Sequence, residues 1–192
     1  PAVGELSNQP PAWQQGPVVE IEQRAYRRIF VGSLGTGGGK GSGGPAAKDD
    51  PKLIFDITRH TCDFMETQAK VGKPFFVQVS HYAEHLDIFY REKSLEKARA
   101  GKIGRKHTMP EFAAMTSDVD EGIGMVLDRI QSLGLQNSTY VFFLSDNGGR
   151  LTMPKQKGKE LPRNHPLRNG KGTMYEGGIR VPFVVIGPGV QP

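Results

Sequence analysis

The chain contains very little cysteine and no long hydrophobic run. Its single cysteine, Cys62, excludes an internal disulfide and leaves the redox environment open. No apolar stretch approaches the roughly 20 residues that a helix needs to cross a bilayer, so we expect no membrane span. Only 36% of the residues are apolar, whereas 25 are glycine and 14 are proline, a balance that favours loops and turns over a helical bundle.

The chain also lacks a concentrated basic segment, although it is positively charged overall. A formal net charge of +5 and a pI of about 9.4 attract anions through long-range steering. The basic residues are scattered and are not interleaved with stacking aromatic residues, so we expect no nucleic-acid partner. An anionic small molecule or a sulfated polymer fits this charge equally well.

The first quarter of the chain carries no binding motif. Residues 35–44 (GTGGGKGSGG) are rich in glycine but lack the spacing of a phosphate-binding P-loop, so a surface excursion is favoured. Residues 1–50 are predicted to be irregular as a whole. The chain begins at Pro1 without a methionine and ends at Pro192 directly after a strand-like run, so we expect an internal fragment of a larger domain.

Two amphipathic segments predict helices, and a third segment is rich in lysine. Asp56 is a fair N-cap for a helix that ends near Gly72. A longer helix begins at Pro110 and ends at Gly134. Its predicted core stripe is Phe112, Met115, Val119, Ile123, Val126, Ile130 and Leu133. The acidic residues off that stripe are predicted to be solvated: Asp118, Asp120, Glu121 and Asp128. Residues 91–106 are predicted to form a solvated helix and loop.

Three short apolar runs predict strands, at residues 74–80, 139–145 and 181–187. The second and third runs do not alternate strictly, as expected where both faces of a parallel sheet are covered. A strand, a long helix and a strand in succession indicate an α/β architecture with helices flanking the sheet.

The segment SDNGG, residues 145–149, follows the second predicted strand. Asp146 and Asn147 offer a carboxylate and an amide oxygen on adjacent residues, and hard cations such as calcium or magnesium take such ligands. Ligands gather beyond the carboxyl ends of strands in open α/β sheets. Because Asp-Asn-Gly is also strong turn chemistry, a plain turn is an equally good interpretation of this segment alone.

A lysine and a histidine complete the set of candidate residues. Lys171 lies between two glycines in NGKGTMYEGGIRVP, and its ammonium suits a tetrahedral oxyanion, although alone it reads as a surface lysine. Glu176 and Arg180 in the same motif are predicted to form a structural pair. His85 lies just past the first predicted strand, where it can bind an anion or protonate a leaving group. His81 is predicted to be a structural hydrogen-bonding residue.

Together these motifs, in this order, closely resemble the middle of the catalytic domain of type I sulfatases, in the alkaline-phosphatase-like superfamily. The resemblance covers residues 51–192 and rests above all on GKGTMYEGGIRVP. It implies a partial alkaline-phosphatase-like fold with a mixed, mostly parallel sheet. Residues 51–192 would be the central, incomplete part of the catalytic domain, and residues 1–50 an irregular excursion of it.

The resemblance also implies roles for individual residues. Asp146 and Asn147 match the positions that ligate Ca²⁺ in the family, and Lys171 matches the lysine that contacts the sulfate ester. His85 matches the histidine that contacts sulfate and helps the leaving alkoxide depart. Family members usually carry His-Thr-Pro where this chain has His85-Leu86-Asp87, a departure that makes the match of His85 weaker than that of Lys171.

The chain lacks the nucleophile that the family uses. That nucleophile is a formylglycine made from the Cys or Ser of Cys/Ser-x-Pro/Ala-x-Arg, a motif found nowhere in the chain. Cys62 does not qualify and is predicted to be a small buried hydrophobe. The paired aspartates of the family's metal site are also missing, because Asp49 and Asp50 lie in the wrong place.

The resemblance therefore predicts a parent protein that hydrolyses sulfate monoesters, with this chain inactive alone. Its partners would be a sulfated small molecule or polysaccharide and a formylglycine-generating maturation enzyme, in a periplasmic, extracellular or lysosomal location. A phosphatase or phosphodiesterase of the same superfamily, with a Thr or Ser nucleophile, is the alternative enzyme. A non-catalytic anion-binding relative is the alternative of a different class.

Overall fold

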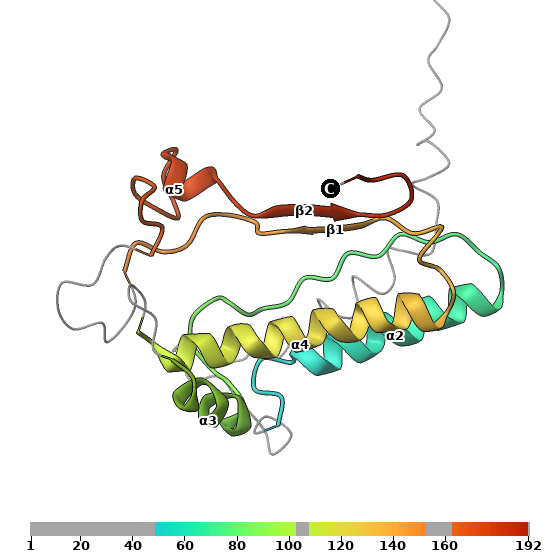
Figure 1. The fold of residues 1–192 in the computed structure, drawn as a ribbon, viewed down its shortest axis with the longest axis horizontal. Coiled ribbons are helices and arrows are strands. Elements are labelled where there is room, and N and C mark those ends of the chain that lie inside the picture. The colour runs from blue at the N-terminus through green and yellow to red at the C-terminus, as the bar shows by residue number, and fades with distance from the viewer. Residues whose placement is uncertain (1–48, 103–107, 153–162, 192) are drawn as a thin grey trace, which may run out of the picture.

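The computed structural model describes residues 49–102, 108–152 and 163–191 (Figure 1). The glycine-rich segment at 35–44, the rest of residues 1–48 and residues 103–107 of the lysine-rich stretch lie outside this part. The elements are α2 (Ile54–Lys70), α3 (Glu92–Ala100), α4 (Pro110–Ser132), β1 (Val141–Leu144), α5 (Glu176–Ile179) and β2 (Phe183–Ile186). In Figure 1, α2 and α4 lie side by side with α3 at one end, and the β1–β2 ribbon lies above them. No helix among the described residues is long and apolar enough to cross a membrane.

Helix α2 begins three residues earlier than the sequence predicted, because its first backbone N–H groups are capped by another residue. The Asp50 carboxylate accepts hydrogen bonds from the backbone N–H groups of Phe55, at 3.2 Å, and Asp56, at 2.8 Å. The helix therefore begins at Ile54, and Asp56 lies in its first turn rather than at its N-cap. A carboxylate at this place satisfies backbone donors that have no partner within the helix.

The predicted ends of both long helices are confirmed. Gly72 follows α2 at φ 63°, and Gly134 follows α4 at φ 69°, in the left-handed region that glycine adopts without strain. Beyond them, Lys73 N donates to Gln68 O at 3.1 Å, and Leu135 N donates to Ile130 O at 3.0 Å. Both helices thus end in the same Schellman arrangement.

The main core lies between α2 and α4. Buried apolar side chains there include Ile54, Met65, Met115 and Ile130, and Cys62 is 5% exposed, which confirms it as a small buried residue. Two members of the predicted α4 stripe, Met115 and Ile130, are thus buried.

A second face of α4 was not expected to be buried. This face, which carries Ala114, Asp118 and Gly122, is buried as well. Asp118 is only 1% exposed, so the prediction that it is solvated is wrong.

The predicted parallel sheet is not confirmed. The strand pair that the described residues form is antiparallel, with Val141 opposite Ile186 and Leu144 opposite Phe183. Residues 74–80, predicted to be a buried strand, run extended without belonging to a strand, and Phe76 is 64% exposed. The reason is that apolar β-rich composition favours extended backbone but does not specify which neighbour pairs with it or in which direction.

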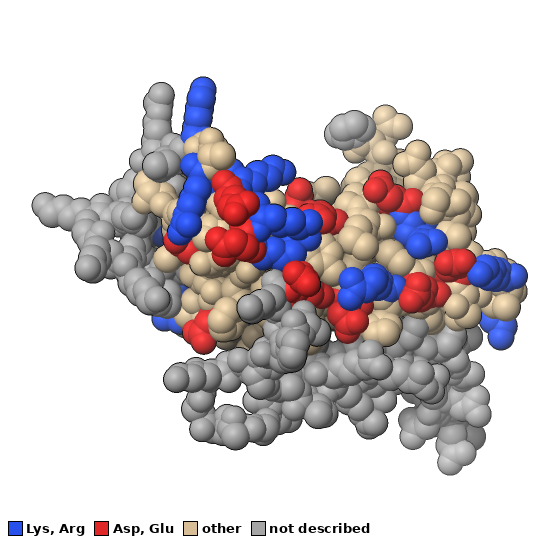
Figure 2. All heavy atoms as spheres, turned by 90° about the horizontal axis from the view of Figure 1, so that it is seen from below, with Lys and Arg blue, Asp and Glu red and all other residues tan. Residues whose placement is uncertain are grey.

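The helical face of the molecule carries mixed charges. Figure 2 shows acidic and basic side chains interspersed over this face. Several form ion pairs, such as Lys70 with Glu66 at 2.7 Å and Arg129 with Glu66 at 3.2 Å. A surface of this kind presents no extended field of one sign.

Candidate functional site

The SDNGG segment and the Lys171 loop form one double loop beyond the carboxyl end of β1. Gly148 N donates to Gly178 O, and Lys171 N donates to Gly149 O, both at 2.9 Å. The contact is so close that a Cβ on Gly148 would lie 1.9 Å from Gly177 O. Two motifs more than 20 residues apart in the sequence therefore meet in the structure.

Asn164 holds the double loop together, although no sequence motif predicted this role. Its side-chain Nδ2 donates to Gly149 O at 2.7 Å and to Asn169 O at 3.0 Å, so one amide group joins both halves. Asn164 belongs to none of the motifs recognised in the sequence, and no signal in its neighbourhood points to this role.

The double loop presents three polar groups. Asp146 and Lys171 are exposed, and neither side chain forms a hydrogen bond or ion pair with the residues that the structure describes. Asn147 uses its Nδ2 to donate to Gly148 O at 3.0 Å, which leaves its amide oxygen to accept. One half of the double loop thus carries a carboxylate and an amide oxygen, and the other half carries an ammonium.

The donor types fit part of a calcium site. A carboxylate and an amide oxygen are ligands that Ca²⁺ prefers, but the ion takes about six to eight oxygens. Among residues 49–102, 108–152 and 163–191, no group of three or more His, Cys, Asp or Glu side chains gathers to hold a metal. Asp146 and Asn147 would therefore supply two ligands of a larger set.

His85 lies in an irregular segment, residues 81–90, between the extended stretch and α3. Its backbone N–H donates to Tyr82 O at 3.0 Å, and its ring Nδ1 lies 2.8 Å from Leu86 O. Since a carbonyl oxygen only accepts, Nδ1 carries the proton of this hydrogen bond. Nε2 is then the ring nitrogen that accepts a proton or, once protonated, donates one.

The Lys52 side chain contacts the backbone of His85. Its Nζ donates to His85 O at 2.8 Å and lies 4.8 Å from the centroid of the Tyr82 ring and 5.4 Å from that of Phe89. Lys52 is only 5% exposed. Burial lowers the pKa of its ammonium to about 8, and the charge of Asp87 opposes this shift.

His81 fulfils its predicted structural role. Its Nε2 lies 3.1 Å from the Thr58 hydroxyl on α2, which attaches the beginning of segment 81–90 to the helix layer. Burial lowers the pKa of the His81 imidazole, against opposing effects of Asp50 and of the Ile54 backbone.

Arg163 packs on the first turn of α4. Its guanidinium lies 3.6 Å from the centroid of the Phe112 ring on α4. Burial lowers its pKa, and the negative charge of Glu84 opposes that shift, so Glu84 and Arg163 are within electrostatic reach. Arg163 precedes Asn164, so the double loop lies near the first turn of α4. No hydrogen bond within the described residues joins His85 directly to Lys171 or Asp146.

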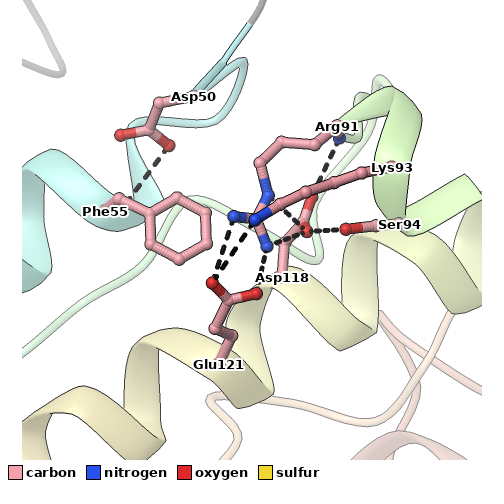
Figure 3. Close-up of polar contacts among 7 residues, drawn as sticks. All are labelled: Asp50, Phe55, Arg91, Lys93, Ser94, Asp118 and Glu121. Carbon is pink, nitrogen blue, oxygen red and sulfur yellow. Dashed lines mark hydrogen bonds and ion pairs between the residues drawn. The ribbon is translucent and has the colours of Figure 1, made fainter.

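A buried ion-pair network anchors the other end of segment 81–90 (Figure 3). Arg91 is 8% exposed; its Nε donates to Asp118 Oδ1 at 2.8 Å, and its Nη1 donates to Glu121 at 3.2 Å. Its guanidinium also lies 3.9 Å from the centroid of the Phe55 ring, and Ser94 donates to Asp118. The hydrogen bond from Arg91 lowers the pKa of Glu121. Glu121 is exposed, as predicted, and it is also ion-paired with Arg91.

The comparisons with known proteins identify the family of the chain. The Sulfatase family model matches residues 46–192, and the chain belongs to the sulfatase family. It is 31% identical over 159 residues to a sulfatase of Formosa agariphila, a match that covers 74% of this chain and 27% of that protein. It is 33% identical over 128 residues to N-acetylgalactosamine-6-sulfatase of Homo sapiens, covering 66% of this chain and 22% of that protein.

Solved structures support the same assignment. The PsFucS1 sulfatase from Pseudoalteromonas sp. matches with a TM-score of 0.59 at 25% identity, over 87% of this chain and 34% of that chain. Ps i-CgsB in complex with k-i-k-neocarrahexaose matches with a TM-score of 0.60 at 26% identity, over 71% of this chain and 28% of that chain. These matches support the predicted alkaline-phosphatase-like fold. The chain spans about a quarter of the length of the two curated relatives, 27% and 22%.

Proposed function

We propose that the protein to which residues 1–192 belong hydrolyses sulfate monoesters, and that the double loop supplies part of its active site. The observation that carries this proposal is the pair of backbone hydrogen bonds, Gly148 N to Gly178 O and Lys171 N to Gly149 O. They join the backbone of Lys171 to the segment that carries Asp146 and Asn147. Family membership, which the match to residues 46–192 shows, supports the same reaction class.

Each candidate side chain has a role that the chemistry of the reaction requires. Cleavage of a sulfate ester builds negative charge on the sulfuryl oxygens and on the leaving oxygen. The exposed ammonium of Lys171 stabilises the charge on the sulfuryl oxygens. The protonated Nε2 of His85 neutralises the leaving oxygen, while the Nδ1 hydrogen bond to Leu86 O keeps the ring in one tautomer. Asp146 and Asn147 would hold Ca²⁺, which supplies further positive charge at the sulfuryl group when bound.

The nucleophile is not among these residues. The 192 residues contain no Cys/Ser-x-Pro/Ala-x-Arg motif, and Cys62 is buried between α2 and α4. Burial also raises the pKa of its thiol, which opposes formation of a thiolate. The proposed reaction therefore needs a formylglycine that residues 1–192 do not contain, and we expect this stretch alone to be inactive.

A sulfated saccharide is the substrate class that we propose. One relative is named N-acetylgalactosamine-6-sulfatase, and the structure of Ps i-CgsB holds a neocarrahexaose. The double loop and its neighbourhood are rich in basic groups that suit an anionic sugar, namely Arg150, Arg163, Arg168 and Lys171. Arg168 is held in place by stacking, with its guanidinium 4.0 Å from the centroid of the Tyr175 ring.

The test is a comparison of sulfate and phosphate esters with protein expressed from the complete open reading frame. Sulfate release from sulfated saccharides and from an aryl sulfate is measured beside phosphate release from the matched phosphate ester. We expect turnover of the sulfates and a fall in kcat/KM of about 100-fold or more for Lys171→Ala, since removal of one such donor typically costs this much. Lys93→Ala, a substitution of an exposed lysine on α3, is the control and should leave the rate unchanged.

Two other results would replace the proposal. A preference for the phosphate ester would favour a phosphatase or phosphodiesterase of the same superfamily. Binding of a sulfated saccharide without turnover, in a correctly matured protein, would favour a non-catalytic anion-binding function.

A further inference from the structure

Segment 81–90 needs external attachment points, because none of its residues belongs to a helix or a strand. Three side chains provide them. His81 contacts Thr58 of α2 at the beginning of the segment, and Arg91 pairs with Asp118 of α4 just beyond its end. Between these two anchors, Lys52 donates to the carbonyl oxygen of His85 itself. Of the three contacts, only that of Lys52 reaches the residue with the proposed chemical role.

We propose that Lys52 is a positioning residue for His85: its ammonium fixes the His85 carbonyl and thereby the place of the imidazole. This inference rests on the proposed function for its catalytic consequence. The contact itself is a property of the fold.

The place of Lys52 in the chain makes it a rigid reference point. Lys52 lies between Asp50, which caps α2, and Ile54, where α2 begins. The backbone around it closes a tight turn, in which Leu53 N donates to Asp50 O at 3.0 Å. Lys52 is therefore anchored next to the start of α2. Its hydrogen bond to the His85 carbonyl restrains the His85 backbone relative to that helix.

Both peptide groups that follow the His85 side chain are then held. Lys52 Nζ donates a hydrogen bond to the His85 carbonyl oxygen. The His85 ring Nδ1 donates to the next carbonyl oxygen, that of Leu86. If the first contact is lost, the peptide group between His85 and Leu86 can rotate, and the second contact no longer sets the ring. Displacement of a catalytic group by about 1 Å can lower the rate about 100-fold.

The environment of Lys52 indicates that its hydrogen bond to His85 is a specific contact, and not a by-product of burial. Burial of a lysine that is only 5% exposed is unfavourable unless polar partners compensate for the water that its ammonium loses. Here the carbonyl, the faces of Tyr82 and Phe89 and the charge of Asp87 provide that compensation. A methionine would fill the same space without this desolvation, but it could not hold the carbonyl.

The test is a double-mutant cycle in protein expressed from the complete open reading frame. Lys52→Met should lower kcat about 10- to 100-fold with little change in KM, and Lys52→Arg, which keeps a donor, should restore part of the loss. In the His85→Ala background, Lys52→Met should cause no further loss, because Lys52 acts through His85. Lys70→Met is the matched control, since the Lys70 side chain is 71% exposed on the same N-terminal half of the chain.

A second readout does not depend on activity. Hydrogen–deuterium exchange of the amides in residues 82–88 should rise about 10-fold or more in Lys52→Met, while that of α4 residues 123–130 stays unchanged. If the wild-type protein shows no sulfatase activity, the proposed function fails, and the exchange result alone decides whether Lys52 fixes the segment. Unchanged exchange in residues 82–88 would overturn the inference.

Two kinetic outcomes would overturn it as well. One is an equal loss of kcat from Lys52→Met in the wild-type and His85→Ala backgrounds, which would show a general structural role. The other is full kcat in Lys52→Met. Should Lys52→Met not fold, Lys52→Leu, which also lacks a donor, enters the same cycle under the same criteria.

Discussion

At the scale of single residues, burial decides what each charged group does. Lys52 and Lys171 are the same residue type, but one is buried against a carbonyl and two aromatic rings and the other is exposed on the double loop. Asp118 and Asp120 are two residues apart on α4, and only Asp118 is buried. The buried members of these pairs hold the fold together, and the exposed Lys171 is the one with a proposed role in chemistry.

His81 gives the fold a predictable dependence on pH. Burial lowers its pKa in the folded state below the ordinary value of 6.5, so the unfolded chain binds more protons just below that pH. The contribution of neutral His81 is therefore complete above pH 6.5 and is lost as the pH falls toward the folded-state pKa. In His81→Gln, we expect the free energy of unfolding to fall less between pH 7.5 and pH 5 than in the wild type. Urea denaturation at both pH values measures it, and equal losses in the two proteins would contradict the assignment.

At the scale of elements, the crossing of α2 and α4 depends on Gly122. A Cβ there would lie 2.9 Å from Cγ2 of Ile54 and 3.0 Å from Oγ1 of Thr58, so Gly122→Ala forces the helices apart. We expect a loss of about 1–3 kcal/mol in the free energy of unfolding. Gly124→Ala is the control on the same helix, because nothing lies within 4 Å of its Cβ position, and it should stabilise by about 0.5–1 kcal/mol. Chemical denaturation measures both, and similar effects of the two substitutions would disprove the close crossing.

The junction of α3 with α4 depends on Asp118. Asp118→Ala leaves the Arg91 guanidinium buried with only the more exposed Glu121 as an anionic partner, so we expect a loss of about 3–5 kcal/mol. Asp120→Ala, on the exposed side of the same helix, should change stability by no more than about 0.5 kcal/mol. Urea denaturation compares the two variants. A small effect of Asp118→Ala would mean that the network contributes little to the junction.

At the scale of the whole molecule, the β1–β2 ribbon leaves an apolar surface uncovered by the described residues. Six large apolar side chains of the ribbon are between 43% and 63% exposed: Phe142, Phe143, Leu144, Phe183, Val184 and Ile186. Exposed apolar surfaces of this size bind other polypeptide chains or cause aggregation. The ribbon therefore makes the isolated 192-residue chain prone to association.

This surface predicts the solution behaviour of residues 1–192 expressed alone. We expect them to bind the dye ANS and to self-associate, and Phe142→Thr with Phe183→Thr, whose rings lie 6.4 Å apart, should reduce both effects. Val71→Thr with Met174→Thr, two exposed positions away from the ribbon, is the control. Dye fluorescence and light scattering are the measurements. A monomeric wild-type chain without dye binding would show that the ribbon is covered.

The sequence by itself determined the features that depend on short-range patterns. The two long helices and their ends follow from apolar spacing and from Gly72 and Gly134, because periodicity and left-handed glycines act within a few residues. The extended runs that became β1 and β2 follow from their β-rich composition. The family follows from SDNGG and GKGTMYEGGIRVP, whose residue types and order are specific enough to be recognised without coordinates.

Only the tertiary structure decided the features that depend on contacts between distant residues. The antiparallel pairing, the capping of α2 by Asp50 and the burial of Asp118 against Arg91 each need a partner that no local pattern specifies. The same holds for the contact of Lys52 with His85, which are 33 residues apart. The physical reason is that burial and hydrogen-bond partnership are set by packing between elements, whereas the sequence pattern reports only the preference of each segment by itself.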